Sequence, residues 1–347
     1  MKYNFLDGYW DKNLGDDLFL KMITDRYPNT EFVIRAPQDY SYIKNVRNMY
    51  KYTYKYNLIS PVTKILFGRQ LTFNQLLKRF SGNTILLGGS IFIEKPYSVE
   101  PEKVKSYYIL GANFGPYYTE KFFNWHKEFF AGAKDVCFRD AYSEKLFSDL
   151  DNVRSETDIA FAYKNIPQCE QRKNAVFSVI DTEQREDIDT EKYEKTICDM
   201  TDIFISKGYT VTFMSFCSKE GDEKAVRRIY EKLSAESRKN TDMYFYKGDI
   251  DEALKVMAES EIIVGGRYHA VILGFVLGKK VYPFTYSDKL NTVLEDMNYQ
   301  GECYDMRKLN FDIKESIEKV MEIPVLDVTS LAKSAERQFR ELDKIFK

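Results

Sequence analysis

The chain has 347 residues, which exceeds the size at which a single hydrophobic core stops growing, so the sequence predicts two domains. Hydrophobic residues make up 44% of the chain and the net charge is −2, which indicates a globular protein and gives no reason to expect a nucleic acid partner. Because the sequence has no run of about 18 apolar residues and does not begin with a signal-peptide pattern, we expect a cytoplasmic protein.

Short apolar runs alternate with helical patterns in the first half of the chain. Strands are expected at residues 2–6, 32–34, 85–87, 108–110 and 136–138. The loop after the first strand leads into a helix whose first turn holds Gly15, Asp16 and Asp17, where acidic side chains complement the helix dipole. The later strands run into polar or glycine-bearing turns, which is typical of a parallel sheet with helices on both faces.

Residues 41–80 are the one strongly charged part of the sequence. They contain no Asp or Glu and eight basic residues: Lys44, Arg47, Lys51, Lys55, Lys64, Arg69, Lys78 and Arg79. Tyrosines and aliphatic residues lie between them, a mixture that suits an anionic membrane surface. The segment therefore predicts a peripheral membrane contact at the inner face of the membrane. The alternative is a solvated face of an insertion in an α/β domain.

A polar stretch at residues 164–173 precedes a second α/β pattern. Strands are expected at residues 175–180, 211–214, 243–246, 262–264 and 280–284, and helices at 191–207, 220–237, 271–277 and 288–297. The predicted organisation is an N-terminal α/β domain at residues 1–165 on the acceptor side and a C-terminal α/β domain at 174–325 on the donor side. A C-terminal helix at 326–347 is expected to pack back on the first domain.

Cysteine and carboxylate patterns give no sign of a metal or a disulfide framework. The five cysteines are scattered and form no CxxC pair, so we expect reduced thiols. Carboxylates are plentiful, but none clusters with His or Cys at ligand spacing. The sequence therefore predicts neither a bound metal nor a bound cofactor.

The motif Gly265-Gly266-Arg267-Tyr268-His269 holds one of only two histidines. It follows a strand pattern and precedes a helix, which is where α/β proteins bind ligands. Together with Lys289, which follows the next strand, it favours a small ligand with several negative charges. The alternative is that His269 is an ordinary surface or core histidine. The other histidine, His126, lies among aromatic residues and is interpreted as structural.

Two doubly wound, Rossmann-like α/β domains facing a cleft match the general plan of glycosyltransferase B enzymes. Within that plan, an ordered set of seven motifs resembles the polysaccharide pyruvyl transferase family. The motifs are Asn13-Leu14-Gly15-Asp16, Gly88-Gly89, Gly111-Ala112-Asn113-Phe114-Gly115-Pro116, residues 136–143 with Arg139-Asp140, Asp158-Ile159-Ala160-Phe161, Arg267-Tyr268-His269 and Tyr286-Ser287-Asp288-Lys289. No single motif is specific, but their order over residues 5–295 is.

The resemblance implies transfer of a pyruvyl group from phosphoenolpyruvate to hydroxyls of a sugar in a surface glycan or its lipid-linked precursor, forming a pyruvate ketal. Such enzymes serve in capsule and exopolysaccharide synthesis. The matching positions make His269, Arg139 and Lys289 the expected catalytic residues. We place Arg267, Gly265, Gly266 and Tyr286 beside the donor, and Asn13, Asp16, Gly88, Gly89 and Asn113 beside the acceptor.

Simpler roles compete for several of these residues. Asp16 can serve only to stabilise its own helix, and Asp140 only to cap the next one. Gly88 and Gly89 can simply form a tight turn. For the whole chain, the alternatives are a glycosyltransferase that uses a nucleotide-sugar donor and a non-catalytic glycan-binding protein of the same fold. The lack of a well-placed acid for a ribose argues against the first, and the Arg, His and Lys trio against the second.

Overall fold

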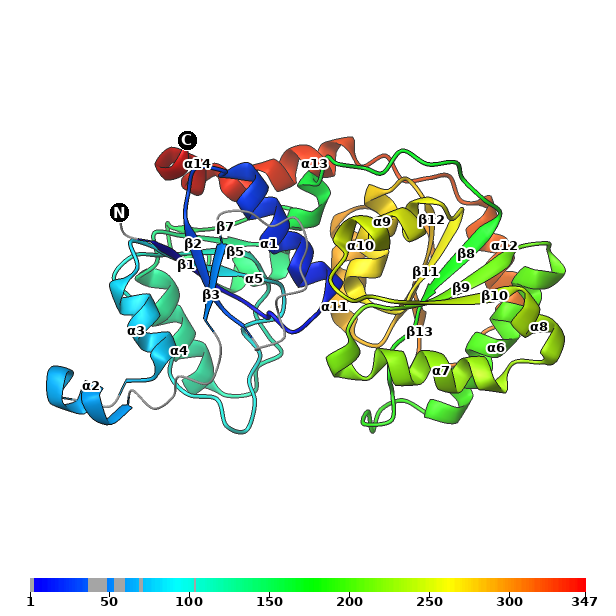
Figure 1. The fold of residues 1–347 in the computed structure, drawn as a ribbon, viewed down its shortest axis with the longest axis horizontal. Helices are drawn as coiled ribbons and strands as arrows, with labels where there is room; N and C mark the ends of the chain where they lie inside the picture. Colours follow the sequence, from blue (N-terminus) through cyan, green and yellow to red (C-terminus); the bar gives the residue numbers. More distant parts are fainter. Residues whose placement is uncertain (1–2, 37–48, 53–59, 69–70, 103) are drawn as a thin grey trace. The chain divides into compact units, whose positions relative to one another are not determined.

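A computed structural model of the chain describes residues 3–36, 49–52, 60–68, 71–102 and 104–347. Its contacts group into two compact units (Figure 1). The first unit comprises Met1–Asp11, Leu18–Ala162 and Ala332–Lys347, and the second comprises Lys12–Asp17 and Tyr163–Leu331. The observed grouping changes between Ala162 and Tyr163, where the prediction had the first domain end at residue 165 and the second begin at 174, and the segment Lys12–Asp17 groups with the second unit. No helix in the described ranges has the length and apolar character needed to cross a membrane.

The first unit is built on a parallel sheet with the strand order β3-β2-β1-β4-β5-β6-β7 (Figure 1). The strands are β1 (Asn4–Asp7), β2 (Phe32–Arg35), β3 (Met49–Tyr52), β4 (Thr84–Leu87), β5 (Tyr107–Ala112), β6 (Asp135–Phe138) and β7 (Val153–Ser155). The chain runs from β1 outward to β3 and then from β4 outward to β7, so the sheet is doubly wound and its direction switches between β1 and β4. Only the edge strands β3 and β7 lack a predicted counterpart, because both are short and carry polar residues.

Helices cover both faces of the first sheet (Figure 1). The helices of the first unit are α1 (Leu14–Arg26), α2 (Ser60–Phe67), α3 (Phe73–Phe80), α4 (Glu120–Ala131) and α5 (Ala141–Leu146), with the 3-10 turn η3 (Ile159–Ala162). On one face, α4 contributes Phe122, Phe129 and Phe130 to the core above β5 and β6. The Cys137 thiol lies within the same sheet, and its burial raises its pKa.

The end of the chain packs on α1 and β2 in the first unit. It forms α13 (Thr329–Glu336), η5 (Arg337–Phe339) and α14 (Arg340–Phe346) instead of one continuous helix. The Phe346 ring lies 5.9 Å from that of Phe32, edge to face. Arg26 at the end of α1 donates hydrogen bonds to Asp343 at 2.7–2.8 Å and to Glu336 at 2.7 Å.

The second unit has a parallel sheet with the strand order β10-β9-β8-β11-β12-β13. Its strands are β8 (Asn174–Ser178), β9 (Thr210–Ser215), β10 (Thr241–Phe245), β11 (Ile262–Gly265), β12 (Lys280–Thr285) and β13 (Tyr304–Asp305). Its helices are α6 (Thr190–Ser206), η4 (Ser218–Glu220), α7 (Asp222–Lys232), α8 (Ala235–Lys239), α9 (Ile250–Ala258), α10 (Tyr268–Val276), α11 (Asp288–Asp296) and α12 (Ile313–Glu322). This sheet is also doubly wound, and its direction switches between β8 and β11.

The single helix predicted at 220–237 is wrong. Leu233 has an extended backbone and ends α7, and Ser234 then caps α8 by accepting a hydrogen bond from the Ser237 amide. A serine side chain competes with the helical hydrogen-bond pattern, so a break at this position is physically reasonable.

One core of the second unit lies under α6, α7 and α12. It includes Phe177, Phe204 and Phe213, which are completely buried. The opposite face is covered by α10, whose Gly274 fits against Ile263 and Val281 of the strands. In Figure 1, α9 and α10 lie on one side of this sheet and α6 and α7 on the other. Both sheets therefore present the carboxyl ends of their strands as an edge lined by loops and helix N-termini.

Candidate functional site

The carboxyl edge of the second sheet is where the predicted motif lies. The β11 strand pairs with β8 on one side and with β12 on the other. The Gly266 amide donates to the Ser178 carbonyl at 3.1 Å, and a Cβ at Gly266 would lie only 2.3 Å from that oxygen. A Cβ at Gly265 would lie 2.4 Å from a Val271 methyl group. Both glycines, placed beside the donor by the sequence, are therefore needed for the close passage of their own loop.

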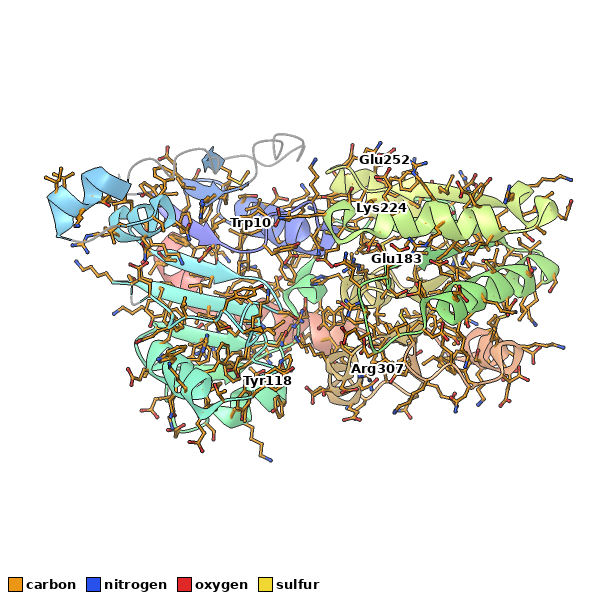
Figure 2. All side chains as sticks on the ribbon, turned by 90° about the horizontal axis from the view of Figure 1, so that it is seen from below. Trp10, Tyr118, Glu183, Lys224, Glu252 and Arg307 are labelled. Atoms are coloured by element: carbon orange, nitrogen blue, oxygen red, sulfur yellow. The ribbon has the colours of Figure 1, made fainter. Side chains whose placement is uncertain are left out.

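Loops that follow several strands meet at this end of the second unit. Figure 2 labels four residues there: Glu183 after β8, Lys224 in the first turn of α7, Glu252 in the first turn of α9 and Arg307 after β13. In an open α/β sheet, this edge is where a ligand binds. The site is therefore built from the ends of different strands.

Arg267 is buried and held by two carboxylates of its own unit. Its Nε donates to Asp222 Oδ2 at 3.0 Å, and its terminal nitrogens contact Asp222 and Glu220. Burial opposes its charged form, but Asp222 and Glu220 raise the pKa of Arg267 well above its ordinary value. Asp222 is itself fixed by the backbone amides of Phe216 and Cys217, at 3.2 and 2.9 Å. In this arrangement Arg267 fixes the loop before His269, and its charge is already balanced.

His269 lies in the first turn of α10 against the start of α1. It is half-buried, and a Cβ at Gly15 would lie 1.9 Å from its Nδ1. Position 15 therefore requires glycine for a steric reason, because any side chain there would displace the imidazole. The ring of Tyr268 is edge-on to His269 at 5.2 Å.

The first turn of α1 is fixed on the second unit by several hydrogen bonds. Asn13 forms an antiparallel bridge with Cys217, and the Leu14 amide donates to the Phe216 carbonyl at 3.1 Å. The Asn13 side chain accepts from the Gly15 amide at 3.1 Å and so caps α1. Asp17 accepts from the Tyr246 hydroxyl at 2.7 Å. Asn13 and Asp16, predicted beside the acceptor, therefore lie in the turn that supports His269, and Asp16 is buried there.

The loop after β12 carries Tyr286 and Lys289. The Thr285 hydroxyl bonds both the amide and the carbonyl of Ser287, which fixes the turn before α11. Lys289 is half-buried in the first turn of α11, and its neighbour Asp288 is paired with Arg307 at 2.5 Å. The Tyr286 ring lies 3.9 Å from the guanidinium carbon of Arg185. Arg185 belongs to the loop after β8, and no motif in the sequence analysis pointed to it.

The predicted residues of the first unit gather at the ends of β4, β5 and β6. Arg139 donates to Asp158 at 3.0 Å and to the Asn113 side chain at 2.9 Å. A Cβ at Gly89 would lie 2.4 Å from the guanidinium of Arg139, so the bare glycine face is its packing surface. Only 4% of the Arg139 side chain is exposed. In this arrangement Arg139 supports the loop that begins with Gly88, whose φ of +138° favours glycine.

Two residues that support Arg139 were not singled out from the sequence. Asp158 accepts from both Arg139 and the Ala160 amide, so it fixes the arginine and begins η3. Gln338 is fully buried and donates to the carbonyls of Phe138, Glu156 and Thr157 at 3.1–3.2 Å. Asp158 lies within one of the seven motifs, whereas Gln338 carries no sequence signal because its partners are about 180 positions away.

Two of the simpler roles proposed from the sequence are confirmed. Asp140 caps α5, since its side chain accepts from the Ser143 amide at 2.7 Å. His126 is buried among Phe92, Phe114 and Phe122, with its Nδ1 at 2.9 Å from the Phe122 carbonyl. Burial lowers the pKa of His126, which agrees with a structural role.

Much of the basic segment 41–80 lies outside the described residues, including Lys44, Arg47, Lys55 and Arg69. The described part exposes Ile65 and Leu66 on α2 at 85% and 68%, next to the exposed Lys64. Phe80 at the end of α3 is 54% exposed and follows Arg79. Among the residues that can be described, no group of three or more His, Cys, Asp or Glu side chains could hold a metal ion.

A family model for polysaccharide pyruvyl transferase matches residues 13–288. The chain belongs to the polysaccharide pyruvyl transferase family. The match begins at Asn13 and ends at Asp288, so it includes the Gly15 and His269 contact and the Arg139 cluster. The pyruvyl transferase resemblance expected from the seven motifs is confirmed. No curated protein matches the sequence.

Solved structures with the same fold support the predicted architecture. The chain is similar to UDP-GlcNAc 2-epimerase from Methanocaldococcus jannaschii, with a TM-score of 0.58, 11% identity, and 99% of this chain and 100% of that chain covered. It is similar to the Neisseria meningitidis UDP-GlcNAc 2-epimerase, with a TM-score of 0.60, 10% identity and coverage of 99% and 100%. Anabaena Alr3699/HepE, solved with UDP and glucose, has a TM-score of 0.54, 9% identity and coverage of 99% of each chain. The chain therefore has a glycosyltransferase-B-like fold of two Rossmann-like α/β units.

Proposed function

We propose that this chain transfers a pyruvyl group from phosphoenolpyruvate to hydroxyls of a sugar in a surface glycan or its lipid-linked precursor. The product is a pyruvate ketal that bridges two hydroxyls. Family membership over residues 13–288 is the observation that carries this proposal. The arrangement of His269 at the carboxyl edge of the second sheet supports it, because this edge is where an open α/β sheet binds a ligand.

The donor is proposed to bind on the second unit beside His269 and Lys289. Phosphoenolpyruvate carries a carboxylate and a phosphate, so its site needs cations and helix N-termini. His269 and Lys289 both lie in the first turn of a helix, α10 and α11 respectively. Helix N-termini attract anions, so these two turns suit the phosphate and the carboxylate.

The chemistry needs a proton at the methylene carbon of phosphoenolpyruvate. Protonation gives an oxocarbenium-like centre at the neighbouring carbon, which one sugar hydroxyl attacks. The bond to the bridging oxygen then breaks, phosphate leaves, and a second hydroxyl closes the ketal. Of the two hydroxyl protons released, one replaces the proton given to the methylene carbon and the other leaves with phosphate. Imidazole exchanges protons near neutral pH, so we assign the general acid and base role to His269.

Arg139 is proposed to act from the first unit through the loop that it supports. Its guanidinium holds Asn113 and packs on Gly89. Gly88, Gly89 and Asn113 therefore form one rigid group, which we propose as part of the acceptor-binding surface. Asn13 and Asp16 are proposed to help at the acceptor from the turn beside His269.

A lipid-linked acceptor would be met at the inner face of the membrane. We propose a peripheral contact there through α2 and the end of α3, where Ile65, Leu66 and Phe80 are exposed beside basic residues. Apolar side chains at head-group depth and nearby cations are the combination that binds anionic lipid.

The nucleotide-sugar glycosyltransferase is the competing proposal, since structures with this fold include proteins solved with UDP. The experiment that separates the two incubates the protein with phosphoenolpyruvate or with UDP-sugars and a panel of lipid-linked and free sugars. Phosphate release together with a sugar product heavier by one pyruvate less one water supports pyruvyl transfer. Release of UDP with a longer glycan would favour the alternative.

A further inference from the structure

Arg185 lies in the loop between β8 and α6, at the point where the second sheet changes direction. It is the one basic residue in a stretch, residues 181–191, that otherwise carries six acids: Asp181, Glu183, Glu186, Asp187, Asp189 and Glu191. An arginine with so many neighbouring carboxylates would ordinarily form ion pairs with them. Across the described residues, none of these carboxylates lies within ion-pair distance of Arg185.

The structure instead places the Arg185 guanidinium over the ring of Tyr286, with the guanidinium carbon 3.9 Å from the ring centre. Two of the nearby acids have another partner, because Arg228 pairs with Asp181 at 3.0 Å and with Glu183 at 3.2 Å. Stacking on an aromatic face fixes the plane of a guanidinium and leaves its N–H groups directed outward from the ring edge. Arg185 is therefore oriented without being neutralised.

The backbone around Arg185 is also fixed. Its amide donates to the Thr182 carbonyl at 2.9 Å, and its carbonyl accepts from the Ile188 amide at 3.3 Å. Thr182 is buried, and its hydroxyl donates a hydrogen bond to the Thr190 hydroxyl at the start of α6, at 2.9 Å. Ile188 is anchored in the core of the unit. The side chain thus projects from a closed turn on a packed base.

The other arginines at the strand ends of the two units are paired with carboxylates. Arg267 is held by Asp222 and Glu220, and Arg307 by Asp305 and Asp288. Arg139 of the first unit is held by Asp158. A donor with about three negative charges needs charge-assisted hydrogen bonds from cations that are not already saturated. Tyr286 directly follows β12, which pairs with β11, so Arg185 on the Tyr286 ring lies at the same edge of the second sheet as the motif that holds His269.

We infer that Arg185 is a donor-binding residue that grips an oxyanion of phosphoenolpyruvate, with Tyr286 as the platform that orients it. This inference rests on the proposed function, because it names a further contact in the same site. The planar fork of the guanidinium matches the two oxygens of a carboxylate or of a phosphate. Lys289, three residues after Tyr286, supplies the neighbouring point charge.

The test is titration calorimetry of phosphoenolpyruvate binding to the full chain and to variants. Arg185→Gln should weaken binding about 10- to 100-fold, as expected for the loss of hydrogen bonds to a charged group. Arg185→Lys should recover part of the loss, because it keeps the charge without the fork. Tyr286→Leu should also weaken binding by removing the platform.

The matched control is Arg227→Gln, since Arg227 stacks on Phe245 at 4.4 Å and pairs with Glu223 on the outside of α7. That variant should bind as the wild type does.

Competition by inorganic phosphate and by pyruvate separates the two oxyanions. If Arg185 binds the phosphate group, Arg185→Gln should weaken the binding of inorganic phosphate and leave the binding of pyruvate unchanged. If Arg185 binds the carboxylate, Arg185→Gln should weaken the binding of pyruvate and leave that of inorganic phosphate unchanged. Equal affinity of wild type and Arg185→Gln for phosphoenolpyruvate overturns this inference alone. No binding by the folded wild type overturns the proposed function together with it. If the melting temperature of Arg185→Gln is far below that of the wild type, the titrations of Arg185→Lys and Tyr286→Leu decide instead. Unchanged affinity for phosphoenolpyruvate in both of these variants overturns the inference.

Discussion

Arg267 and Arg139, the arginines of two family motifs, are both saturated by carboxylates of their own unit. Asp222 contacts Arg267 and two backbone amides, and Asp158 contacts Arg139 and the start of η3. Removing either arginine would leave a buried carboxylate without its partner, which typically destabilises a protein by about 3–5 kcal/mol. Variants of these residues therefore report on folding as well as on activity, and the site is better tested at other positions.

Gly15→Ala is the substitution that tests the position of His269. The added methyl group would lie 1.9 Å from Nδ1 of the imidazole, so the ring must turn away or the start of α1 must move. We expect pyruvyl transfer to fall about 100-fold or more, close to the 10²- to 10⁴-fold loss expected for His269→Gln, because both changes remove the positioned acid and base. Steady-state rates with phosphoenolpyruvate measure this.

The control is Gly278→Ala in the loop before β12. Gly278 has a φ of +65° and nothing within 4 Å of a Cβ, so alanine there strains the backbone without touching the site. Both variants should lose stability to a similar degree, about 1–3 kcal/mol, while only Gly15→Ala loses activity. Full activity in Gly15→Ala would show that the imidazole position does not matter to the reaction.

Sequence reasoning located His269 and Lys289 but could not show what surrounds them. Strand patterns and glycines predict which residues follow each parallel strand, and these residues necessarily meet at one edge of a sheet. The contact between Gly15 and His269 joins positions 254 apart in the chain, and no local pattern encodes it. Arg185 was missed for the same reason, because its acid-rich surroundings read as a solvated loop and its ring partner lies about 100 positions away.

The α1 helix shows how one element serves two clusters of contacts. Its first turn, from Leu14 to Asp17, groups with the second unit, and its remaining turns group with the first. The last turn holds the C-terminal segment through Arg26, which also lies 4.4 Å from the Phe339 ring. The helix itself was predicted, with its acidic first turn, but its division between the units was not.

The Asp343 carboxylate, which attaches α14 to α1, makes the free energy of unfolding depend measurably on pH. Burial alone would raise its pKa, but hydrogen bonds from Arg26, Tyr27 and Lys347 lower it to about 2, against an ordinary value of 3.8. A lowered pKa stabilises the fold above the ordinary value and loses that effect as pH falls toward 2. Since the group is partly exposed, solvent screening limits the contribution to about 1 kcal/mol.

The measurement is the free energy of unfolding of wild type and Asp343→Asn by urea at a series of pH values. The difference should be constant from neutral pH down to about 5 and should shrink progressively below it. Asp149→Asn is the control, because Asp149 forms an exposed ion pair with Lys127 and should change stability little at any pH. A difference for Asp343→Asn that grows on acidification would contradict the assignment.

The exposed apolar side chains of α2 predict salt-sensitive binding to anionic vesicles. A flotation assay should find wild type with anionic but not with neutral vesicles at low salt, and high salt should release it. The double variant Ile65→Ser and Leu66→Ser should lose most of the binding, because the inserted area is removed. Val325→Ser, which changes an exposed apolar residue of the second unit, is the control and should bind normally. Equal binding to neutral vesicles would argue against an electrostatic membrane contact and for a soluble acceptor.

At the scale of the whole molecule, the two doubly wound parallel sheets were predictable because the sequence alternates buried strands with amphipathic helices. The strands β8, β9, β11 and β12 in particular are buried along almost their whole length, as expected for parallel strands covered on both faces. The unit boundaries were only partly predictable: the end of the chain was expected on the first unit, where Ala332–Lys347 lies, but the grouping of Lys12–Asp17 with the second unit was not expected. Membership of the family implies a transferase of pyruvyl groups, and the donor is what the proposal adds.

The most direct test of that donor is a product assay with phosphoenolpyruvate, a panel of lipid-linked sugars, and mass spectrometry of the sugar. Wild type should release one phosphate for each sugar that gains the mass of a pyruvate less one water, and His269→Gln, although folded, should release almost none. UDP-sugars should not substitute for phosphoenolpyruvate. Wild-type protein that leaves phosphoenolpyruvate intact with every acceptor while transferring a sugar from a UDP-sugar would contradict the account.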